Sequence, residues 1–312
     1  MKNILQYKLL PVLLLLLSGG CFFFRGDLTA PELAQMGFHA VSGNPGTLTH
    51  PRGVLKLTPG KRTCFINGMQ YFLPHAVTVD EKGRCRISPL GMEKVIKPVF
   101  GETTIPYPVR TVILDPGHGQ NDFGAKGKKY NEKDLNLALA KEIAAALKKR
   151  GFEVRMTRMN DTFLTLDQRG KLAKKANGDL FLSIHHNASQ NKNSTGVETY
   201  IVTPAGSASS NDQETQIHAK SVSGNRYDAV NMQLASLIQQ NMVKRTRSAD
   251  RGVRFARFRV LALSQLPGAL IEAGFVSNAA EEIQCGSQLR QKKIADAIAD
   301  AIAKLNLPGR KK

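Results

Sequence analysis

The sequence predicts an α/β fold, in which a single, mostly parallel twisted sheet is flanked by helices and preceded by a small β-rich module. From residue 110 onward, short apolar or alternating runs typical of strands take turns with longer amphipathic runs typical of helices. The run TVILD at 111–115 is apolar without alternation, as in a strand that is buried on both faces of a parallel sheet. Such alternation favours helices layered on a sheet over separate all-β or all-α units.

The N-terminal 21 residues have the layout of a secretory signal peptide. Lys2 and Lys8 accompany a leucine-rich run that is too short for a comfortable transmembrane helix, and small residues follow it. The sequence LSGGC at 17–21 resembles a bacterial lipobox, in which Cys21 is lipidated and becomes the first mature residue. We expect an exported protein of the periplasm or cell envelope, attached to a membrane through Cys21. Simple cleavage and an uncleaved anchor are the alternatives.

Two segments separate this signal from the α/β region. Residues 22–52 are rich in Gly, Pro, Ser and Thr without a sustained period, which predicts a flexible tether. Residues 53–105 hold short β-prone runs with turn pairs at 67–68 and 82–83, then a helical patch and a linker. This module resembles the small N-terminal module of copper amine oxidases, a resemblance that implies no metal role. We expect His75, within the module, to be structural or exposed.

Cysteine usage argues against a cysteine-based zinc site. Besides Cys21 the chain has Cys64, Cys85 and Cys285, and no CxxC pair occurs. Cys64 and Cys85 could form a disulfide in an oxidising compartment, or they could be two unpaired buried thiols.

The α/β region, residues 106–309, is expected to contain the following elements. Strands are predicted at 111–115, 152–158, 179–184, 197–203, 258–263 and 268–275. Helices are predicted at 134–151, 166–178, 231–247 and 289–305. The polar, Gly- and Ser-rich segment 203–232 is expected to be an open surface loop with His218 exposed.

Polar residues follow three of the predicted strands at the point where each strand ends. His118 follows the first strand, His185 and His186 end the run FLSIHH, and Glu272 ends the run GALIE. Ligands bind beyond the carboxyl ends of strands in open α/β sheets, and Glu132, at the start of a helix, could reach the same edge. Two histidines and one carboxylate are the ligand set of a catalytic zinc site, and a further free carboxylate suits a general base. Taken singly, Glu132 could instead serve only the helix dipole.

Charge and glycine patterns exclude some other functions. The net charge of +19 indicates anionic surroundings, such as a membrane surface or an acidic polymer. No basic motif interleaved with aromatic residues occurs, so we expect no nucleic-acid partner. Gly117 and Gly119 are followed by Gly124, one position too late for a dinucleotide fingerprint, and no Walker lysine follows.

Several ordered motifs are similar to a known family. They are ILDPGHGQNDFGAKG, NEKDLNLALAKEIAAAL, FLSIHHNAS, GVETYIV, DRGVRFARFRVL and ALIEAGFVSN. Over residues 110–306 they resemble the zinc-dependent N-acetylmuramoyl-L-alanine amidases of the bacterial cell wall (Amidase_3 type). The resemblance implies one Zn²⁺ per chain and peptidoglycan as the substrate. It also implies cleavage of the amide between the lactyl group of N-acetylmuramic acid and the first L-alanine of the stem peptide.

The resemblance assigns roles residue by residue. It implies that His118, Glu132 and His185 bind zinc. Glu272 would take a proton from the attacking water and later protonate the leaving amine.

Three further residues match or depart from the family pattern. Asn187 follows the pattern and is a candidate for substrate binding. His186 stands where alanine is common, and it would either line the cleft and help to bind substrate or simply be exposed. Arg169 matches a family position and is expected to brace the fold. A catalytically silent wall-binding relative, and a zinc peptidase that cuts within stem peptides, remain alternatives, and any protein activator is unknown.

Overall fold

The computed structural model describes residues 26–101 and 108–305. The expected signal peptide with Cys21, the start of the expected tether and part of the linker lie outside the described residues. Among the described residues, no helix combines the length and the apolar character needed to cross a bilayer.

The catalytic region forms a mostly parallel sheet, as expected. Its strands are β8 (Thr111–Pro116), β9 (Glu153–Met156), β10 (Leu180–Asn187), β11 (Val197–Val202), β12 (Asp250–Ala256) and β13 (Gly268–Phe275). They lie in the order β12-β11-β13-β10-β8-β9, and β11 with β13 is the antiparallel pair in this series. The carboxyl ends of β8, β10 and β13 therefore meet at one edge of the sheet.

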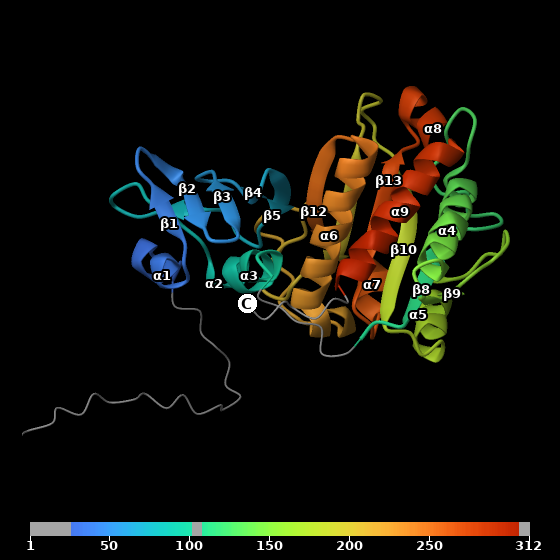
Figure 1. Ribbon diagram of the computed structural model, residues 1–312, viewed down its shortest axis with the longest axis horizontal. Coiled ribbons are helices and arrows are strands. Elements are labelled where there is room, and N and C mark those ends of the chain that lie inside the picture. The colour runs from blue at the N-terminus through green and yellow to red at the C-terminus, as the bar shows by residue number, and fades with distance from the viewer. Residues whose placement is uncertain (1–25, 102–107, 306–312) are drawn as a thin grey trace, which may run out of the picture.

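Helices cover both faces of this sheet. Figure 1 shows α4 (Glu132–Lys148), α9 (Gln288–Leu305) and α6 (Asp228–Thr246) packed side by side across one face. The other face carries the short helices α5 (Leu166–Lys175) and α7 (Arg259–Leu263). Successive residues of β10 serve opposite faces, since Leu182 packs in the α4–α9 core and Phe181 packs against the α5–α7 side.

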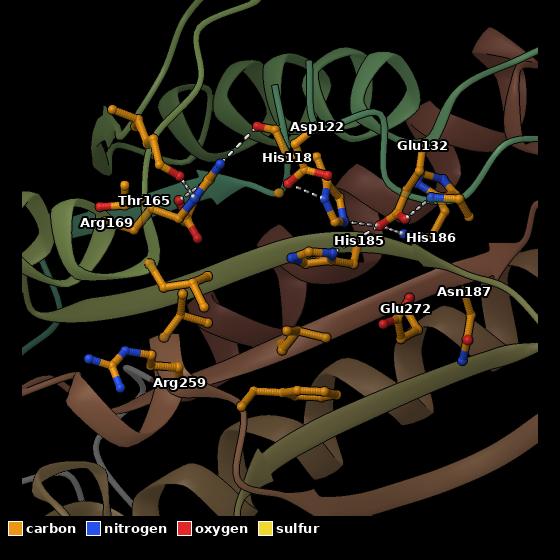
Figure 2. A pocket seen from close by; sticks show the side chains of 18 of the residues that line it. His118, Asp122, Glu132, Thr165, Arg169, His185, His186, Asn187, Arg259 and Glu272 are labelled. Carbon is orange, nitrogen blue, oxygen red and sulfur yellow. Dashed lines mark hydrogen bonds and ion pairs between the residues drawn. The ribbon is translucent and has the colours of Figure 1, made fainter. Parts of the chain in front are cut away.

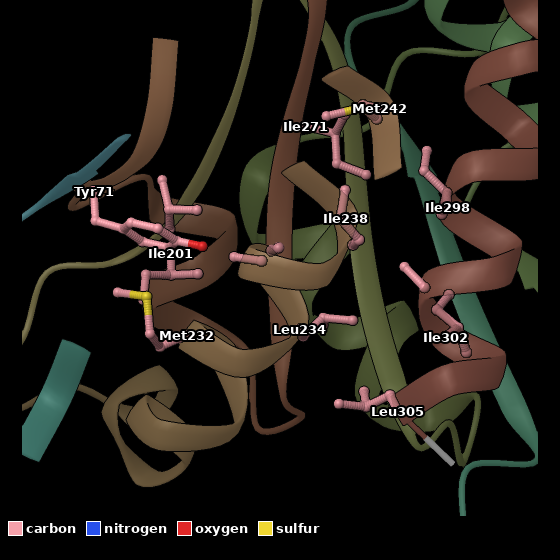
Figure 3. Close-up of a cluster of buried hydrophobic side chains, with 14 of the residues drawn as sticks. Tyr71, Ile201, Met232, Leu234, Ile238, Met242, Ile271, Ile298, Ile302 and Leu305 are labelled. Carbon is pink, nitrogen blue, oxygen red and sulfur yellow. The ribbon is translucent and has the colours of Figure 1, made fainter. Parts of the chain in front are cut away.

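The larger core lies between the sheet and helices α6 and α9. Leu234, Ile238 and Met242 of α6 project toward Ile271 of β13, while Ile298 and Ile302 project from α9 (Figure 3). The residues of α6 recur at intervals of four, which keeps them on one helix face. This spacing is the reason that the sequence predicted α6 and α9 correctly.

One predicted strand is wrong. Residues 258–263 were expected to form a strand, but Arg259–Leu263 is helix α7, and the neighbouring strand is β12. A short apolar run fits a strand or a single buried helical turn equally well. Val260 and Leu261, which are adjacent in sequence, are both buried against the same side of the sheet, as one turn of helix allows and an alternating strand does not.

The tether prediction for residues 22–52 is also wrong over its described part. Helix α1 (Ala30–Gln35) and strands β1 (His39–Val41) and β2 (Asn44–His50) occupy it. Both strands are largely exposed, so they lack the alternating apolar pattern that would have revealed them. Leu33, Phe38 and Leu48 bury this segment in the core of the module.

The module as a whole is an antiparallel meander. It continues through β3 (Gly53–Leu57), β4 (Thr63–Ile66) and β5 (Met69–Phe72). The turn predicted at 67–68 is confirmed, because Asn67 and Gly68 both have positive φ and link β4 to β5. A small hairpin of β6 (Thr78–Val79) and β7 (Cys85–Arg86) follows, and then α2 (Pro89–Gly91), the π-helical turn η1 (Met92–Ile96) and α3 (Lys97–Val99).

The module is joined to the catalytic sheet along a contact that we call the seam, formed by β5 with β12 and α6. Strand β5 pairs in parallel with β12 through Tyr71 and Val253. Strands β1 to β5 of the module therefore belong to one 11-stranded sheet with the catalytic strands. Tyr71 is fully buried, and its hydroxyl lies 2.7 Å from Ser236 Oγ and accepts a hydrogen bond from Gln240. The module thus continues the catalytic sheet and is not a separate domain joined only by a linker.

The segment 203–232 is not an open loop. Its end forms the 3₁₀ turn η2 (Ser223–Tyr227) and the start of α6. Its middle packs on the module, where the Arg62 guanidinium donates to the carbonyls of Ala208 and Ser209. His75 bonds the carbonyl of Gly206 and is therefore structural, as expected.

Two further sequence expectations are settled by side-chain positions. His218 was expected to be exposed, but it is half-buried and its Nε2 lies 3.1 Å from Ser209 Oγ. Cys64, Cys85 and Cys285 are all free and buried, which agrees with the unpaired alternative for the first two.

Candidate metal centre and active-site cleft

Three of the predicted site residues meet at the carboxyl edge of the sheet. His118 lies in the loop after β8, Glu132 begins α4, and His185 lies near the end of β10. Glu132 Oε1 is 2.9 Å from His185 Nδ1 and 3.2 Å from His118 Nε2, as the dashed lines of Figure 2 show. One ligand atom from each residue lies within 4.8 Å of the other two.

The backbone of the His118 loop is shaped around this cluster. His118 has a φ of 63°, in the left-handed region that a non-glycine residue seldom adopts. Gly124, in the same loop, also has a positive φ, and a Cβ there would lie 2.5 Å from Glu132 Oε2. Strain of this kind is found where the surrounding structure holds a functional side chain in place.

Buried arginines hold the same loop from beneath. Arg169 is 3% exposed and donates to Asp115 Oδ1 and to the carbonyl oxygens of Pro116 and His118. Arg158 donates to the carbonyls of Pro116 and Gly117. Arg169 therefore braces the fold, as expected.

Hydrogen bonds from neighbouring side chains orient two of the three residues, His118 and Glu132. His118 Nδ1 lies 2.8 Å from Asp122 Oδ2, the carboxylate–histidine arrangement common behind metal-bound imidazoles. On the other side of the cluster, Asn136 donates to Glu132 Oε1 and to the carbonyl of Gly117.

His186 belongs to this set of hydrogen bonds. Simple exposure is wrong, because the side chain is buried and its Nδ1 donates to Asn136 Oδ1 at 2.8 Å. Burial lowers the pKa of His186 to about 4, so the ring is neutral near pH 7. Because β10 alternates, His185 faces the cleft while His186 points toward α4.

Glu272 is the least satisfied polar group at the site. Its β13 position pairs in register with His185 of β10, and its Oε2 is inaccessible and lacks a hydrogen-bond partner among the described residues. Burial, and then the negative charges of Glu132 and Glu198, raise the pKa of Glu272 well above its usual value. A carboxylate oxygen that is buried without a partner is costly, so its persistence points to a chemical role.

Asn187 lies at the end of β10 beside this carboxyl. Its Nδ2 donates to Glu198 Oε2, and its Oδ1 accepts the N–H of Ala188. Glu198 is itself buried and accepts hydrogen bonds from Tyr200 and Arg251. Asn187 is thus held in a fixed orientation at the cleft.

A cleft of 510 Å³ opens over these groups, lined by His118, Glu132, His185, Asn187 and Glu272. Figure 2 shows Thr165 and Arg259 on one side of the cluster and Asn187 on the other. The residues present fit a zinc ion. Two imidazoles and one carboxylate converge from one side, and the cleft leaves the opposite side open. Burial opposes the ionisation of Glu132, but hydrogen bonds from His118 and His185 hold its pKa well below the usual value.

Sequence reasoning found the ligand cluster and Glu272 but missed Asp122, Asn136 and Glu198. Asp122 had a usable signal, since it follows His118 by four positions in the same loop. Asn136 and Glu198 carried none, because each acts through a neighbour that is distant in sequence.

Comparisons with known proteins agree with this geometry. The model of the Amidase_3 family, described as N-acetylmuramoyl-L-alanine amidase, matches residues 112–304. LytC of Bacillus subtilis, an N-acetylmuramoyl-L-alanine amidase, is 35% identical over 65% of this chain, a match that spans 35% of LytC. AmiA of Salmonella typhimurium, also an N-acetylmuramoyl-L-alanine amidase, is 32% identical over 62% of this chain and 75% of its own length.

A solved structure gives the same result. The catalytic domain of the amidase CwlV from Bacillus (Paenibacillus) polymyxa is 34% identical, with a TM-score of 0.52, over 62% of this chain and 97% of its own. Because the family match covers more than half of the residues and includes His118, Glu132 and His185, the chain belongs to the Amidase_3 family of N-acetylmuramoyl-L-alanine amidases.

Proposed function

We propose that this chain is a zinc-dependent peptidoglycan hydrolase. It cleaves the amide bond between N-acetylmuramic acid and the first L-alanine of the stem peptide. The observation that carries the proposal is the unpartnered Glu272 carboxyl facing the His118–Glu132–His185 cluster across one cleft. The identity of the cleaved bond is inferred from membership of the family.

The roles of the residues follow from their positions. We assign the binding of one Zn²⁺ to His118, Glu132 and His185. Bound zinc polarises a carbonyl and makes water more acidic. Glu272 accepts the proton of the attacking water and then protonates the leaving amine of L-alanine, a task that suits a carboxyl whose pKa is raised above its usual value by burial.

Hydrogen bonds from neighbouring side chains keep this arrangement in place. Asp122 orients His118, and Asn136 orients Glu132. Asn187, fixed by Glu198, presents its amide to the cleft as a substrate contact. His186 borders the cleft beside Glu132, and its side chain bonds Asn136, so we assign it to holding that amide in place.

We further propose that the chain is exported to the periplasm or cell envelope. The signal layout of the N-terminal residues and the lipobox-like LSGGC support this, with Cys21 as the site of lipidation and membrane attachment. The catalytic unit would then comprise residues 106–309, and the seam would hold the module against it. Incorporation of labelled palmitate by wild type, and its loss in Cys21→Ala, tests the lipid attachment.

The proposed activity is tested by digesting purified muropeptides with zinc-loaded protein and identifying the products by mass. The expected products are an intact glycan and a free stem peptide with an N-terminal L-alanine. Peptides cut internally would assign the chain to the peptidases instead. Binding to the muropeptides without any product would mark it as a silent relative.

A further inference from the structure

A second groove, of 560 Å³, continues the active-site cleft along the same edge of the sheet. It is formed by loops that follow β8, β10 and β13, at residues 126–128, 192–193 and 276–280. Ala125 lines the cleft and the next residue, Lys126, lines the groove. A hydrogen bond of 2.8 Å from the Val276 amide to the Asn187 carbonyl joins the two hollows at a second place.

This groove, which we call the lysine groove, carries unneutralised positive charge. Lys126, Lys128 and Lys192 line it with exposed side chains. In the part of the chain that the structure describes, the lysine ion pairs are formed by lysines elsewhere, and these three take part in none. Such free ammonium groups favour an anionic ligand.

The acidic residue of the groove does not cancel this charge. Glu282 is 1% exposed, and its Oε1 accepts the backbone N–H groups of Lys129 and Tyr130 at 2.6 and 2.8 Å. The carboxylate thus anchors the backbone of the 126–130 loop and attracts Lys128, and Lys126 Nζ lies 4.3 Å from the centre of the Phe123 ring. The three lysines still outnumber this one carboxylate in the groove.

The loops of the groove are fixed in place. Gly127 passes so close to Glu282 that a Cβ there would lie 2.1 Å from Oε1. Asn278 Nδ2 donates to the carbonyl of Lys192, and the Ser189 amide donates to Ser277 Oγ. The groove is therefore formed before any ligand arrives, which lowers the entropic cost of binding.

The opposite end of the cleft has a different character. Phe163, Leu166 and Phe258 line it and are 46%, 47% and 37% exposed. Arg259, the cation on this side, is paired with Asp167 at 2.8 Å. An apolar, aromatic surface suits the faces of sugar rings, and it offers no free cation to a carboxylate.

From this polarity we propose that the lysine groove binds the carboxylates of the stem peptide, while the muramic acid sugar lies toward Phe163 and Phe258. The inference rests on the proposed function, because the scissile amide separates an uncharged sugar side from an anionic peptide side. The metal-ligand cluster lies between the two ends, so the substrate crosses it in one direction. The lysines thereby determine a preference for stem peptides with free carboxyl groups.

The test compares two substrates and two triple variants. One muropeptide keeps its stem carboxylates, and the other has the same carboxylates converted to amides, which leaves the scissile bond unchanged. Lys126→Gln, Lys128→Gln and Lys192→Gln are combined in the groove variant. The control removes the same charge from exposed lysines of α4 and its C-cap, with Lys141→Gln, Lys148→Gln and Lys149→Gln.

Wild type and the control should show a KM about tenfold lower for the acidic muropeptide than for the amidated one. The groove variant should lose this difference through a raised KM for the acidic substrate, with kcat unchanged. Lys192→Gln alone, which alters a single exposed side chain, should reduce the difference about twofold to threefold. Thermal melting of every variant checks that folding is intact.

Other results would overturn the inference in distinguishable ways. If wild type cleaves neither muropeptide, the proposed function fails and the groove assignment fails with it. If wild type cleaves both, and the groove variant keeps the preference for the acidic one, only the groove assignment fails. If the groove variant keeps its preference for the acidic muropeptide and a glycerol phosphate polymer inhibits wild type, the lysines bind an anionic wall polymer instead.

Discussion

Two regions bring polar side chains into the interior of the sheet, and they differ in whether those groups are satisfied. At the seam, the Tyr71 hydroxyl bonds Ser236 and Gln240, and these two also bond each other. At the metal centre, Glu272 Oε2 lacks a partner among the described residues, and Glu132 shares its carboxylate between two histidines. Hydrogen-bonded polar groups stabilise a contact, whereas a buried polar group without a partner is costly and marks a candidate ligand site.

At the metal centre, we expect a single side chain to decide activity. Glu132→Ala removes the carboxylate that both histidines contact, so we expect loss of bound zinc and of all measurable amidase activity. Zinc content by mass spectrometry and muropeptide turnover measure the two effects. Glu142→Ala, on the same helix, serves as the control and should keep both. A Glu132→Ala protein with full zinc content would remove Glu132 from the ligand set.

The seam should respond in stability instead of activity. Tyr71→Ala deletes a fully buried ring, and we expect the free energy of unfolding to fall by about 3–5 kcal/mol. Tyr71→Phe keeps the ring and loses only the hydroxyl, so about 1 kcal/mol is expected. Urea denaturation measures both changes. Tyr71 does not line the cleft, so kcat at 25 °C should be unchanged in both variants. A large fall in kcat for Tyr71→Phe would mean that the seam acts on the active site.

The residues behind the His118–Glu132–His185 cluster should affect zinc affinity more than turnover. His186→Ala removes the donor to Asn136 Oδ1 and so loosens the amide that orients Glu132. We expect zinc affinity to fall about 10- to 100-fold, with kcat at saturating zinc within about threefold of wild type. Competition with a zinc-binding dye measures the affinity, and Asn136→Ala should reproduce the change. Unchanged affinity in both variants would reduce His186 to a packing role.

The same contrast explains what the sequence could predict. His118 follows β8, and His185 and Glu272 come at the end of the apolar runs that begin β10 and β13. Because the carboxyl ends of these strands meet at one edge, the site was predictable from local patterns. Strands β1 and β2 were not, since their side chains are mostly exposed and only Leu48 of β2 is buried. Helix α7 was mistaken for a strand because its four consecutive apolar residues carry no clear period.

His186 shows a second limit of sequence reasoning. The resemblance singled out His185, but nothing local in the sequence distinguishes the two histidines. The pleat of β10 turns the His185 side chain to Glu132 and the His186 side chain to Asn136. Its partner lies 50 positions away, on a different element.

The central claim is that an unpartnered carboxyl beside a zinc site performs the proton transfers, and Glu272→Gln tests it most directly. Zinc content and muropeptide turnover are measured on the same preparation of wild type and variant. We expect about one zinc per chain in both proteins and a fall in kcat of about 10²- to 10⁴-fold in the variant. A Glu272→Gln protein that keeps its zinc and still releases stem peptides at the wild-type rate would contradict the account.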